Sequence, residues 1–373
     1  MRIIFPTMKF YPVQSGGPIY TLFWHCSELL KQNIDVKIIS TNEGFDTIKG
    51  VRPTTDILLH TDFGDIIYYS GKSKLIKQLV YLVRNCKSSD FVHLNSFFSP
   101  ISFLSFLALR IFSKKTKIVW STRGELSRSA LKYNSFKKVP ILLIIKPLTK
   151  RVMFHVTSVK EGIEVDDVLG KRNIICIPNL IRSEQVAHVE KEKILLFIGR
   201  IHPIKCIENL IEAVYASQLF KDSGYKLIIA GKYEDRFADY YKDLRKRCTK
   251  YNLTNQIVFL SHITGKEKSE LFARSRFTFL PSLTENFGNV VVESLQQGTP
   301  VVASRGTPWE ELVRFGSGFH ISNSPDCLAK IIDEIILMPE TLYSDMCHNA
   351  IHHVNSTYSI ESRISDWLKI YST

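Results

Sequence analysis

The sequence lacks the cysteine patterns that hold small secreted domains or structural zinc sites together. Its seven cysteines are odd in number and scattered, and no two of them form a Cys-x-x-Cys pair. A disulfide framework or a structural zinc cluster is therefore not expected, and a reducing compartment is favoured. The apolar run at the start, Met1 to Pro6, is too short for a secretory signal.

Long apolar runs are also missing. The longest uncharged stretch, residues 91–109, contains His93, Asn95, four serines and Pro100. Such a composition indicates a strand, a turn and the start of a helix rather than a membrane-spanning segment. We expect a protein that is soluble or bound at a membrane surface.

Acidic residues are scarce in the first half of the chain. Residues 1–180 contain 26 Lys and Arg against 13 Asp and Glu, whereas residues 181–373 contain 23 of each. The imbalance is largest in the segment 101–151, where twelve basic residues accompany only Glu125 and alternate with apolar runs. Cations interleaved with apolar side chains favour the headgroup zone of an anionic membrane.

Two other interpretations of the segment 101–151 stay open at this point. Its helices could be ordinary core helices with solvated basic faces. A phosphate backbone would be attracted to the same charges, but no nucleic-acid-binding signature accompanies them, so we expect no nucleic-acid partner.

Length and pattern predict two domains of the α/β class. At 373 residues the chain has about twice the usual domain size. Strand-like runs alternate with helical patterns on both sides of a polar stretch at 182–193, which predicts two doubly wound parallel sheets. We expect a first domain of residues 1–182, joined by a returning C-terminal helix at about 357–373, and a second domain of residues 183–356. Because ligands of such sheets bind at the carboxyl ends of strands, a site is expected in a cleft between the domains.

The first candidate site residues follow the first strand of the second domain. Gly199 and Arg200 come directly after the run 194–198, and Lys205 follows within one short loop. A strand end, a loop and a helix start bring two cations and free backbone amides together, as a diphosphate site requires. A solvated Arg and Lys on an ordinary loop is the plain alternative.

A second set of candidates lies in residues 281–293. Glu285 stands just before an expected helix, Gly288 lets a ligand approach the backbone, and Glu293 lies one to two turns inside the helix. The amides of Phe287 to Asn289 would point at a bound ligand. Each carboxylate can accept two hydroxyl hydrogens, which suits a vicinal diol of a sugar or ribose.

Taken together, these motifs resemble the retaining glycosyltransferases of family four, which have the GT-B fold of two Rossmann-like domains. The resemblance is carried by Gly199-Arg200-x4-Lys205, by Glu285-x7-Glu293 with Phe287-Gly288, and by the run Gly298-Thr299-Pro300-Val301-Val302-Ala303. The Gly16-Gly17 loop, Val92-His93 and Ile177-Pro178-Asn179 look similar to the same family. The segment 120–126 resembles a loop of members that build bacterial polysaccharides and O-antigen.

The resemblance implies transfer of a hexose or N-acetylhexosamine from a nucleotide-sugar to a hydroxyl, with the anomeric configuration retained. UDP is favoured as the carrier over GDP, and no cofactor or metal is expected. The first domain would bind the acceptor and the second domain the donor. A phosphate oxygen of the leaving group would take the acceptor proton, so catalysis would rest on positioning and electrostatics.

The resemblance also implies a role for each matching residue. Arg200 and Lys205 would hold the diphosphate, Glu293 the ribose, and Glu285 the donor sugar. The remaining donor contacts would come from Gly16, Gly17, His93, Gly199, Phe287, Gly288 and Asn289. In the basic segment, Arg123 and Glu125 would meet an acceptor phosphate, unless they pair with each other.

Two positions depart from the family pattern, and metal chemistry has no support in the sequence. Cys206 stands where the family usually has glycine, and the acidic loop near 306–308 is altered to Trp309-Glu310-Glu311. There is no Asp-x-Asp motif, by which the other glycosyltransferase architecture holds a divalent cation. His348 and His352 share one helical face, but no third ligand is evident near them.

We therefore expect a cytoplasmic enzyme at the inner face of the cytoplasmic membrane that extends a lipid-linked saccharide in O-antigen or capsule assembly. A GT-B nucleotide-sugar epimerase, or a transferase acting on soluble sugars, would share the donor site but would have no use for the basic apolar face. A nucleic-acid-binding protein would use that face but would leave Glu285 and Glu293 unexplained.

Overall fold

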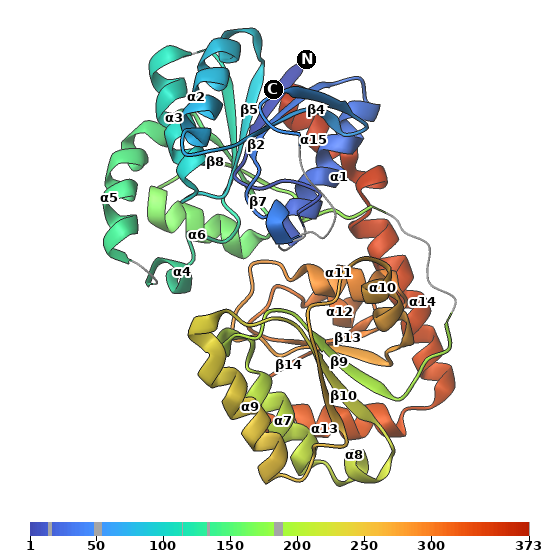
Figure 1. The fold of residues 1–373 in the computed structure, drawn as a ribbon. Coiled ribbons are helices and arrows are strands. Elements are labelled where there is room, and N and C mark those ends of the chain that lie inside the picture. The colour runs from blue at the N-terminus through green and yellow to red at the C-terminus, as the bar shows by residue number, and fades with distance from the viewer. Residues whose placement is uncertain (14–16, 48–53, 114, 133–134, 183–188, 373) are drawn as a thin grey trace. The chain divides into compact units, whose positions relative to one another are not determined.

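The computed structural model describes residues 1–13, 17–47, 54–113, 115–132, 135–182 and 189–372. Their contacts divide the chain into unit 1, Met1–Arg182 with Arg363–Thr373, and unit 2, Ser183–Ser362. Each unit is a mainly parallel sheet flanked by helices (Figure 1), which confirms the predicted α/β class. The returning segment of unit 1 starts at Arg363, whereas the sequence analysis placed it at about 357.

Unit 1 is built on an eight-stranded sheet with the order β3-β4-β2-β1-β5-β6-β7-β8. The pairs are parallel except β3 with β4, an antiparallel hairpin at one edge. The strands are β1 (Arg2–Pro6), β2 (Asp35–Thr41), β3 (Leu58–Thr61), β4 (Gly64–Tyr69), β5 (Phe91–Asn95), β6 (Lys117–Ser121), β7 (Met153–Val156) and β8 (Asn173–Cys176). The helices are α1 (Gly17–Lys31), α2 (Lys74–Asn85), α3 (Pro100–Phe112), α4 (Arg128–Lys132), α5 (Ser135–Ile145), α6 (Val159–Leu169) and α15 (Ile360–Ser372), with short 3-10 turns η1 (Phe45–Thr47), η2 (Cys86–Ser88) and η3 (Lys146–Arg151).

Unit 2 has a six-stranded, fully parallel sheet with the order β11-β10-β9-β12-β13-β14. The strands are β9 (Ile194–Ile198), β10 (Lys226–Ala230), β11 (Ile257–Leu260), β12 (Phe277–Leu280), β13 (Val301–Ser304) and β14 (Gly318–Ile321). The helices are α7 (Ile207–Ala216), α8 (Gln218–Asp222), α9 (Ala238–Lys250), α10 (Gly265–Arg274), α11 (Asn289–Gln296), α12 (Glu311–Arg314), α13 (Pro325–Leu337) and α14 (Glu340–Thr357), with 3-10 turns η4 (Pro203–Lys205) and η5 (Asp235–Phe237).

The central strands are continuous apolar runs because helices cover both faces of each sheet. All five residues of β9 are buried. Leu195 and Phe197 belong to one core cluster, which also takes in side chains of α7 and α13, and Leu196 belongs to a second cluster on the opposite face with side chains of α10. Successive strand residues point to opposite faces, so one run supplies both clusters.

In each sheet, successive strands are first added on one side of the first strand and then on its other side. In unit 2, β9 lies between β10 and β12, and in unit 1, β1 lies between β2 and β5. The loops that follow such a pair of strands leave the sheet in opposite directions and open a crevice at the carboxyl ends. The loops after β9 and β12, and those after β1 and β5, are therefore the places to look for ligands.

Some local expectations differ from the structure. The helical pattern of the sequence predicts one helix over 134–150, but α5 ends at Ile145 and a 3-10 turn follows, because Pro147 has no amide hydrogen and disfavours a helical residue before it. The pattern also predicts one helix over 207–220, but it is divided at Ser217, whose hydroxyl accepts from the Phe220 amide at 2.9 Å and starts α8. Within the described ranges, no helix combines the length and the apolar character that crossing a bilayer requires.

Candidate functional site

Two loops of unit 2 meet at the carboxyl ends of the neighbouring strands β9 and β12. Residues 199–206 follow β9, and residues 281–288 follow β12. The loops are joined directly, since the Leu283 amide donates to the Ile204 carbonyl at 2.8 Å. The two sequence motifs therefore lie at one edge of one sheet, at its point of reversal.

The loop after β9 ends in a tight turn that places Lys205. Pro203 begins η4, and His202 caps this turn because its Nδ1 accepts from the Ile204 amide at 3.0 Å. Burial lowers the pKa of His202, and the nearby Arg200 and Lys205 act in the same direction, so the ring stays neutral and Nδ1 remains an acceptor. The sequence analysis did not select His202, although a polar residue before a proline is a common helix-start signal.

Cys206, which stands where the related family has glycine, adopts a backbone conformation typical of glycine. Its φ of 50° and ψ of 44° lie in the left-handed region. Its side chain is buried, and burial raises the pKa of the thiol, which also contacts the Asn323 side chain. The thiol is thus packed inside unit 2, and a residue with a Cβ is accommodated at this position.

Cys206→Gly is expected to change the free energy of unfolding by less than about 1 kcal/mol, because relief of left-handed strain offsets the lost burial of the thiol. Cys206→Val should be less stable than Cys206→Gly by about 1–2 kcal/mol, since β-branched residues fit this region worst. Urea unfolding of both variants measures the difference. Equal stability of the two would contradict the described turn.

Lys205 and Glu285 form an ion pair that joins the two loops. Lys205 Nζ contacts Glu285 Oε1, and the side chains are only 13% and 15% exposed. Ser282 Oγ donates to the same carboxylate oxygen at 3.0 Å, and the Ser282 carbonyl accepts from Ser304 Oγ at the end of β13. Gly306 lies so close that a Cβ there would be 2.1 Å from the Leu283 carbonyl oxygen. Loops from three adjacent strands therefore fix the position of Glu285.

Residues 287 and 288 lead into α11, which begins at Asn289, and the Phe287 side chain packs inward. The Phe287 ring is buried, with ring centroids 5.1 Å from Trp309 and 5.6 Å from Tyr358. Gly288 has a φ of +86°, and a Cβ there would lie 3.0 Å from a Leu280 methyl group. The Phe287 side chain is thus a core anchor, so the ligand contact expected from this residue is limited to its amide.

Glu293 is paired with a lysine that the sequence analysis did not select. Lys268, on α10, donates to both carboxylate oxygens of Glu293 at 2.8 and 2.7 Å. Both side chains remain about one-quarter exposed. The pattern of α10 gave no signal for this partner, because only packing of α10 beside α11 brings Lys268 to Glu293.

Arg200 and Gly199 lie at the same strand end but are not part of the ion pair. The Gly199 amide donates to the Ala230 carbonyl at 3.0 Å, and Gly231 approaches so closely that a Cβ on it would be 1.8 Å from the Gly199 oxygen. The Arg200 side chain is 70% exposed, and its guanidinium lies 3.7 Å from Glu234. It is a second cation at this edge with freedom to reorient.

This edge can hold a substrate that carries both anionic groups and hydroxyls. Lysine, arginine and the amides at a helix start attract anions, and the start of α11 adds the positive end of a helix dipole. Carboxylates accept hydrogen bonds from neighbouring hydroxyls. Among the described residues, no group of three or more His, Cys, Asp and Glu side chains is arranged to hold a metal ion.

In unit 1, the candidates after β1 and β5 have different outcomes. Gly16 lies outside the described residues, and Gly17 begins α1. His93 is 1% exposed, with Nδ1 bonded to the Tyr371 hydroxyl at 2.6 Å and Nε2 to Ser121 Oγ at 2.8 Å. This corrects the expectation that His93 contacts a donor sugar, because both ring nitrogens are used inside unit 1.

His93 belongs to a chain of hydrogen bonds whose direction is determined at one end. His155 Nε2 must donate to the Ile177 carbonyl, 2.8 Å away, so its Nδ1 accepts from the Ser121 hydroxyl at 2.7 Å. Ser121 then accepts from His93 Nε2, and His93 Nδ1 accepts from the Tyr371 hydroxyl. Every group in the chain is neutral, and burial lowers the pKa of His155 to about 3 and that of His93 well below its usual value. The chain fastens α15 to three strands of the sheet.

Arg123 and Glu125 follow β6 and do not pair with each other through hydrogen bonds. Arg123 donates to the side-chain oxygens of Asn179 at 2.8 Å and Asn95 at 2.9 Å. Glu125 accepts from Ser96 Oγ at 2.6 Å and from the Phe98 amide at 2.8 Å. Glu125 therefore holds the loop after β5, which limits its availability to a ligand.

The buried Glu161 is another residue that the sequence analysis did not select. Its carboxylate accepts from the Thr122 hydroxyl and the Gly124 amide, both at 2.6 Å, and from the amide and hydroxyl of Thr157. It thereby fixes the loop that carries Arg123. The spacing Ser158-x-x-Glu161 is a capping-box pattern and was the available signal.

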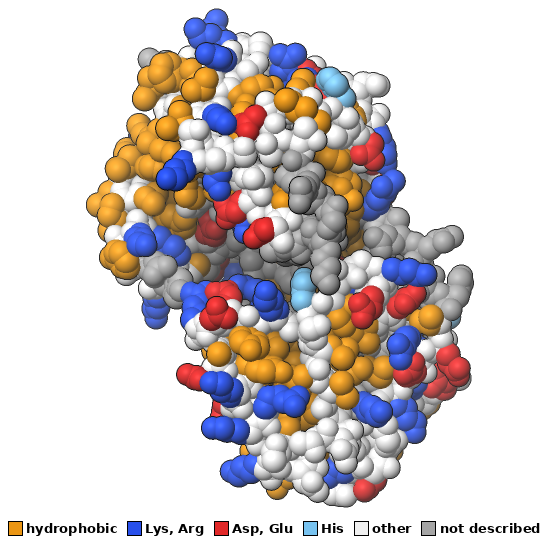
Figure 2. Space-filling model, viewed as in Figure 1, with side chains coloured by type: hydrophobic (Ala, Val, Ile, Leu, Met, Phe, Trp, Pro, Cys, Tyr) orange, Lys and Arg blue, Asp and Glu red, His pale blue; other side chains and the backbone are white. Residues whose placement is uncertain are grey.

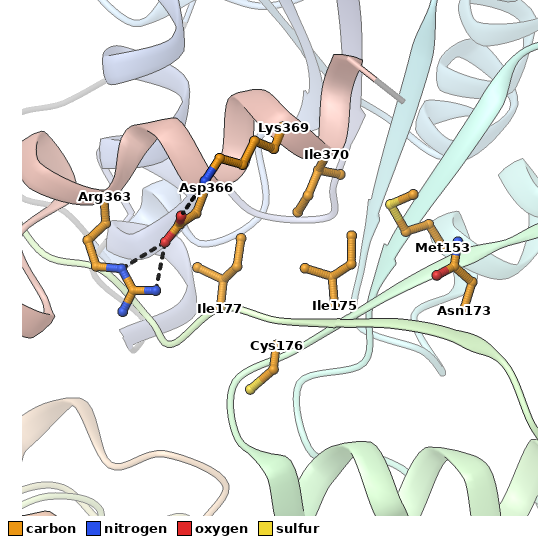
Figure 3. A pocket seen from close by; sticks show the side chains of 9 residues that line it. All are labelled: Met153, Asn173, Ile175, Cys176, Ile177, Arg363, Asp366, Lys369 and Ile370. Atoms are coloured by element: carbon orange, nitrogen blue, oxygen red, sulfur yellow. Dashed lines mark hydrogen bonds and ion pairs between the residues drawn. The ribbon is translucent and has the colours of Figure 1, made fainter.

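Unit 1 also contains a pocket of about 480 Å³ between β8 and α15 (Figure 3). Arg363 and Lys369 line it, and both are paired with Asp366, at 2.6 and 3.7 Å. None of the sequence-predicted site residues lines this pocket, and its two cations are both paired with the same carboxylate. We assign it no role.

Comparison with known proteins finds a family that resembles unit 2. Residues 181–353 match the family described as "Glycosyl transferases group 1". An uncharacterized glycosyltransferase of Methanocaldococcus jannaschii is 29% identical over 49% of this chain and 45% of its own length. The O-antigen chain mannosyltransferase RfbU of Salmonella typhimurium is 23% identical over 55% of this chain and 57% of its own length. The chain thus spans about half the length of these curated relatives.

Solved structures match over the whole chain. Anabaena Alr3699/HepE, crystallised in complex with UDP and glucose, superposes with a TM-score of 0.77 at 18% identity and covers 99% of both chains. TarM superposes with a TM-score of 0.75 at 15% identity, covering 100% of this chain and 99% of its own. At these identities the likeness establishes the fold, which is GT-B. Residues 181–353 of this chain are therefore similar to the glycosyl transferases group 1 family.

Proposed function

We propose that this chain is a retaining glycosyltransferase of family four that moves a hexose or N-acetylhexosamine from a nucleotide-sugar to a lipid-linked saccharide. UDP is the favoured carrier and GDP the alternative. The observation that carries the proposal is the Lys205–Glu285 pair at the carboxyl ends of β9 and β12. It joins a cation for a diphosphate to a carboxylate for sugar hydroxyls at one fixed position.

In this proposal, Lys205 and Arg200 neutralise the diphosphate, aided by Gly199 and by the amides of 287–289. Glu285 binds hydroxyls of the donor sugar. Glu293 binds the ribose diol, and its partner Lys268 orients the carboxylate. An orienting lysine lowers the entropy that the carboxylate loses when it binds a diol.

The proposed reaction needs no side chain as a base. The acceptor oxygen forms a bond to the anomeric carbon while the bond from that carbon to the phosphate oxygen breaks, and its electron pair stays on the phosphate. The proton of the acceptor hydroxyl passes to a phosphate oxygen on the same face. The cations hold the leaving diphosphate, so stabilisation of developing charge supplies most of the rate.

Nucleotide binding tests the donor site. UDP at about 100 times its dissociation constant should stabilise the folded chain by about 2.7 kcal/mol and raise its melting temperature. GDP and dTDP are the matched comparisons, and Lys205→Met should abolish the shift. If none of the three nucleotides raises the melting temperature, the donor-site assignment fails.

We further propose that unit 1 lies on the inner face of the cytoplasmic membrane, where it meets the lipid-linked acceptor during synthesis of a cell-surface polysaccharide. Figure 2 shows hydrophobic side chains gathered over α3 and α5, with basic side chains between them. Ile111, Phe136 and Leu143 are 70%, 71% and 72% exposed. Arg110 of α3 donates to the Leu148 carbonyl of η3 at 2.7 Å, which places the end of α3 beside η3.

The double variant Phe136→Ser with Leu143→Ser should bind vesicles containing an anionic phospholipid at least about tenfold more weakly. Full burial of one such side chain contributes about 1.5–3 kcal/mol, and partial burial of both in the headgroup zone is enough for this effect. Flotation of the full chain with these vesicles measures the effect. Leu337→Ser is the matched control, since Leu337 of unit 2 is 68% exposed. Equal flotation of the double variant and the control would contradict membrane contact through α5.

A further inference from the structure

Arg123 has an unusual backbone conformation for an arginine. Its φ is 55°, in the left-handed region, and Gly124 follows with a φ of 72°. The Thr122 hydroxyl and the Gly124 amide, on either side of Arg123, are both held by Glu161 at 2.6 Å. Residues in sparsely populated conformations persist where the surroundings over-determine them, and they gather at functional sites.

Among the described residues, no carboxylate forms an ion pair with Arg123. Nη1 and Nη2 bond to the neutral side-chain oxygens of Asn179 and Asn95. Glu161 and Glu125 act on this charge through space, but their hydrogen bonds go to other groups: Glu161 accepts four, and Glu125 accepts two from the loop after β5. Burial lowers the pKa of Arg123 to about 10, so the side chain is still charged at neutral pH.

Two hydrogen-bond donors beside this charge have no partner in the described part of the chain. They are Arg123 Nε and Asn95 Nδ2, and both atoms are buried. The two donors belong to side chains in direct contact, since Asn95 Oδ1 accepts from Arg123 Nη2 at 2.9 Å. A cation that has an unpaired donor, beside a second unpaired donor, calls for an anionic oxygen.

The position of these residues is also that of a ligand site. Asn95 ends β5 and Arg123 follows β6, both at the carboxyl edge of the sheet of unit 1. β5 is one of the two strands at which this sheet reverses direction, where ligands of doubly wound folds bind. Arg123 as a residue is partly exposed, although its Nε atom is buried.

We propose that Arg123 and Asn95 bind a phosphate oxygen of a substrate, and that this phosphate belongs to the diphosphate of the acceptor. The proposal rests on the proposed function for its substrate. The donor diphosphate is the other source of the same chemistry, and the experiment separates the two.

The test uses the full chain saturated with UDP and titrated calorimetrically with methylenediphosphonate, a stable diphosphate. The wild type should bind the probe although UDP fills the donor site. Arg123→Gln should weaken this binding about 10- to 100-fold. Arg128→Gln is the matched control, because it removes the same charge from a side chain that is 92% exposed, and it should bind as the wild type does.

A second variant separates binding from folding. Asn95→Asp keeps the arginine, removes the unpaired donor and gives the guanidinium a carboxylate partner, so it should bind the probe at least tenfold more weakly while its melting temperature rises. Normal binding by Arg123→Gln or by Asn95→Asp would overturn the proposal. Binding that vanishes when UDP is present would assign the phosphate to the donor and overturn the acceptor assignment. Failure of UDP itself to bind would refute the proposed function. In that case, the difference in probe binding between the wild type and Arg123→Gln would still test the phosphate site at Arg123.

Discussion

Replacing Glu285 with glutamine is expected to lower the rate of sugar transfer by about 100- to 1,000-fold. The change keeps the size of the side chain but removes the charge that holds Lys205 and accepts from Ser282. Lys205 would lose its fixed position, and a diphosphate would lose a preorganised cation. Lys205→Met should have an effect of similar size, because the two side chains act as one unit.

A double-mutant cycle tests that coupling. The variant carrying both changes should lose far less than the product of the two single losses, since residues in contact are not additive. Transfer rates with a nucleotide-sugar, and circular dichroism to establish folding, are the measurements. Glu270→Gln is the control, because Glu270 is a surface residue of α10 paired only across one helical turn. Full activity of Glu285→Gln would remove the basis of the proposed mechanism.

Acidification below about pH 6.5 is expected to destabilise unit 1 strongly. Burial holds the pKa of His25 and His93 well below the ordinary value of 6.5 and lowers that of His155 to about 3. Because the folded pKa is depressed, each neutral ring contributes stability that is complete above pH 6.5 and is lost as the pH falls towards the folded value. At pH 5 the loss is about 2 kcal/mol for His155 alone, and His25 and His93 add losses of the same sign, which is a large share of the stability of many domains.

Hydrogen–deuterium exchange at pH 7.5, 6 and 5 can locate this loss. Amides of β5 and β6 should lose protection below pH 6, whereas β9 of unit 2 should change less. His25→Phe should reduce the pH dependence, because it removes one titrating ring and a buried Nε2 without a partner in the described structure, yet keeps an aromatic contact with Trp367. The exposed His348→Gln should leave the dependence unaltered. If protection of the β5 amides from exchange did not change with pH, the neutral row of hydrogen bonds through His93 and His155 would be contradicted.

The donor motifs could be predicted from the sequence because their signals are local. Gly199, Lys205, Gly288 and the start of α11 are specified by residues a few positions away, through turn geometry and strand ends. The alternation of continuous apolar runs with helical patterns also predicted both sheets, because a strand that is buried on two faces consists almost entirely of apolar residues. The edge strands β3 and β14 were missed because short edge strands carry little of that signature, and β4, which lies between β3 and β2, was missed with its hairpin partner.

The sequence by itself determined the fold class, the basic first half and the loop that carries each charged site residue, because composition and short-range backbone preference decide those properties. Only the tertiary structure decided which side chains meet. It paired Lys205 with Glu285 and Lys268 with Glu293, enclosed His93 beneath Tyr371 from 278 positions away, and placed Arg123 between Asn95 and Asn179. Such partners are set by the order of strands and by helix packing across long sequence separations, and no local pattern encodes a contact of that kind.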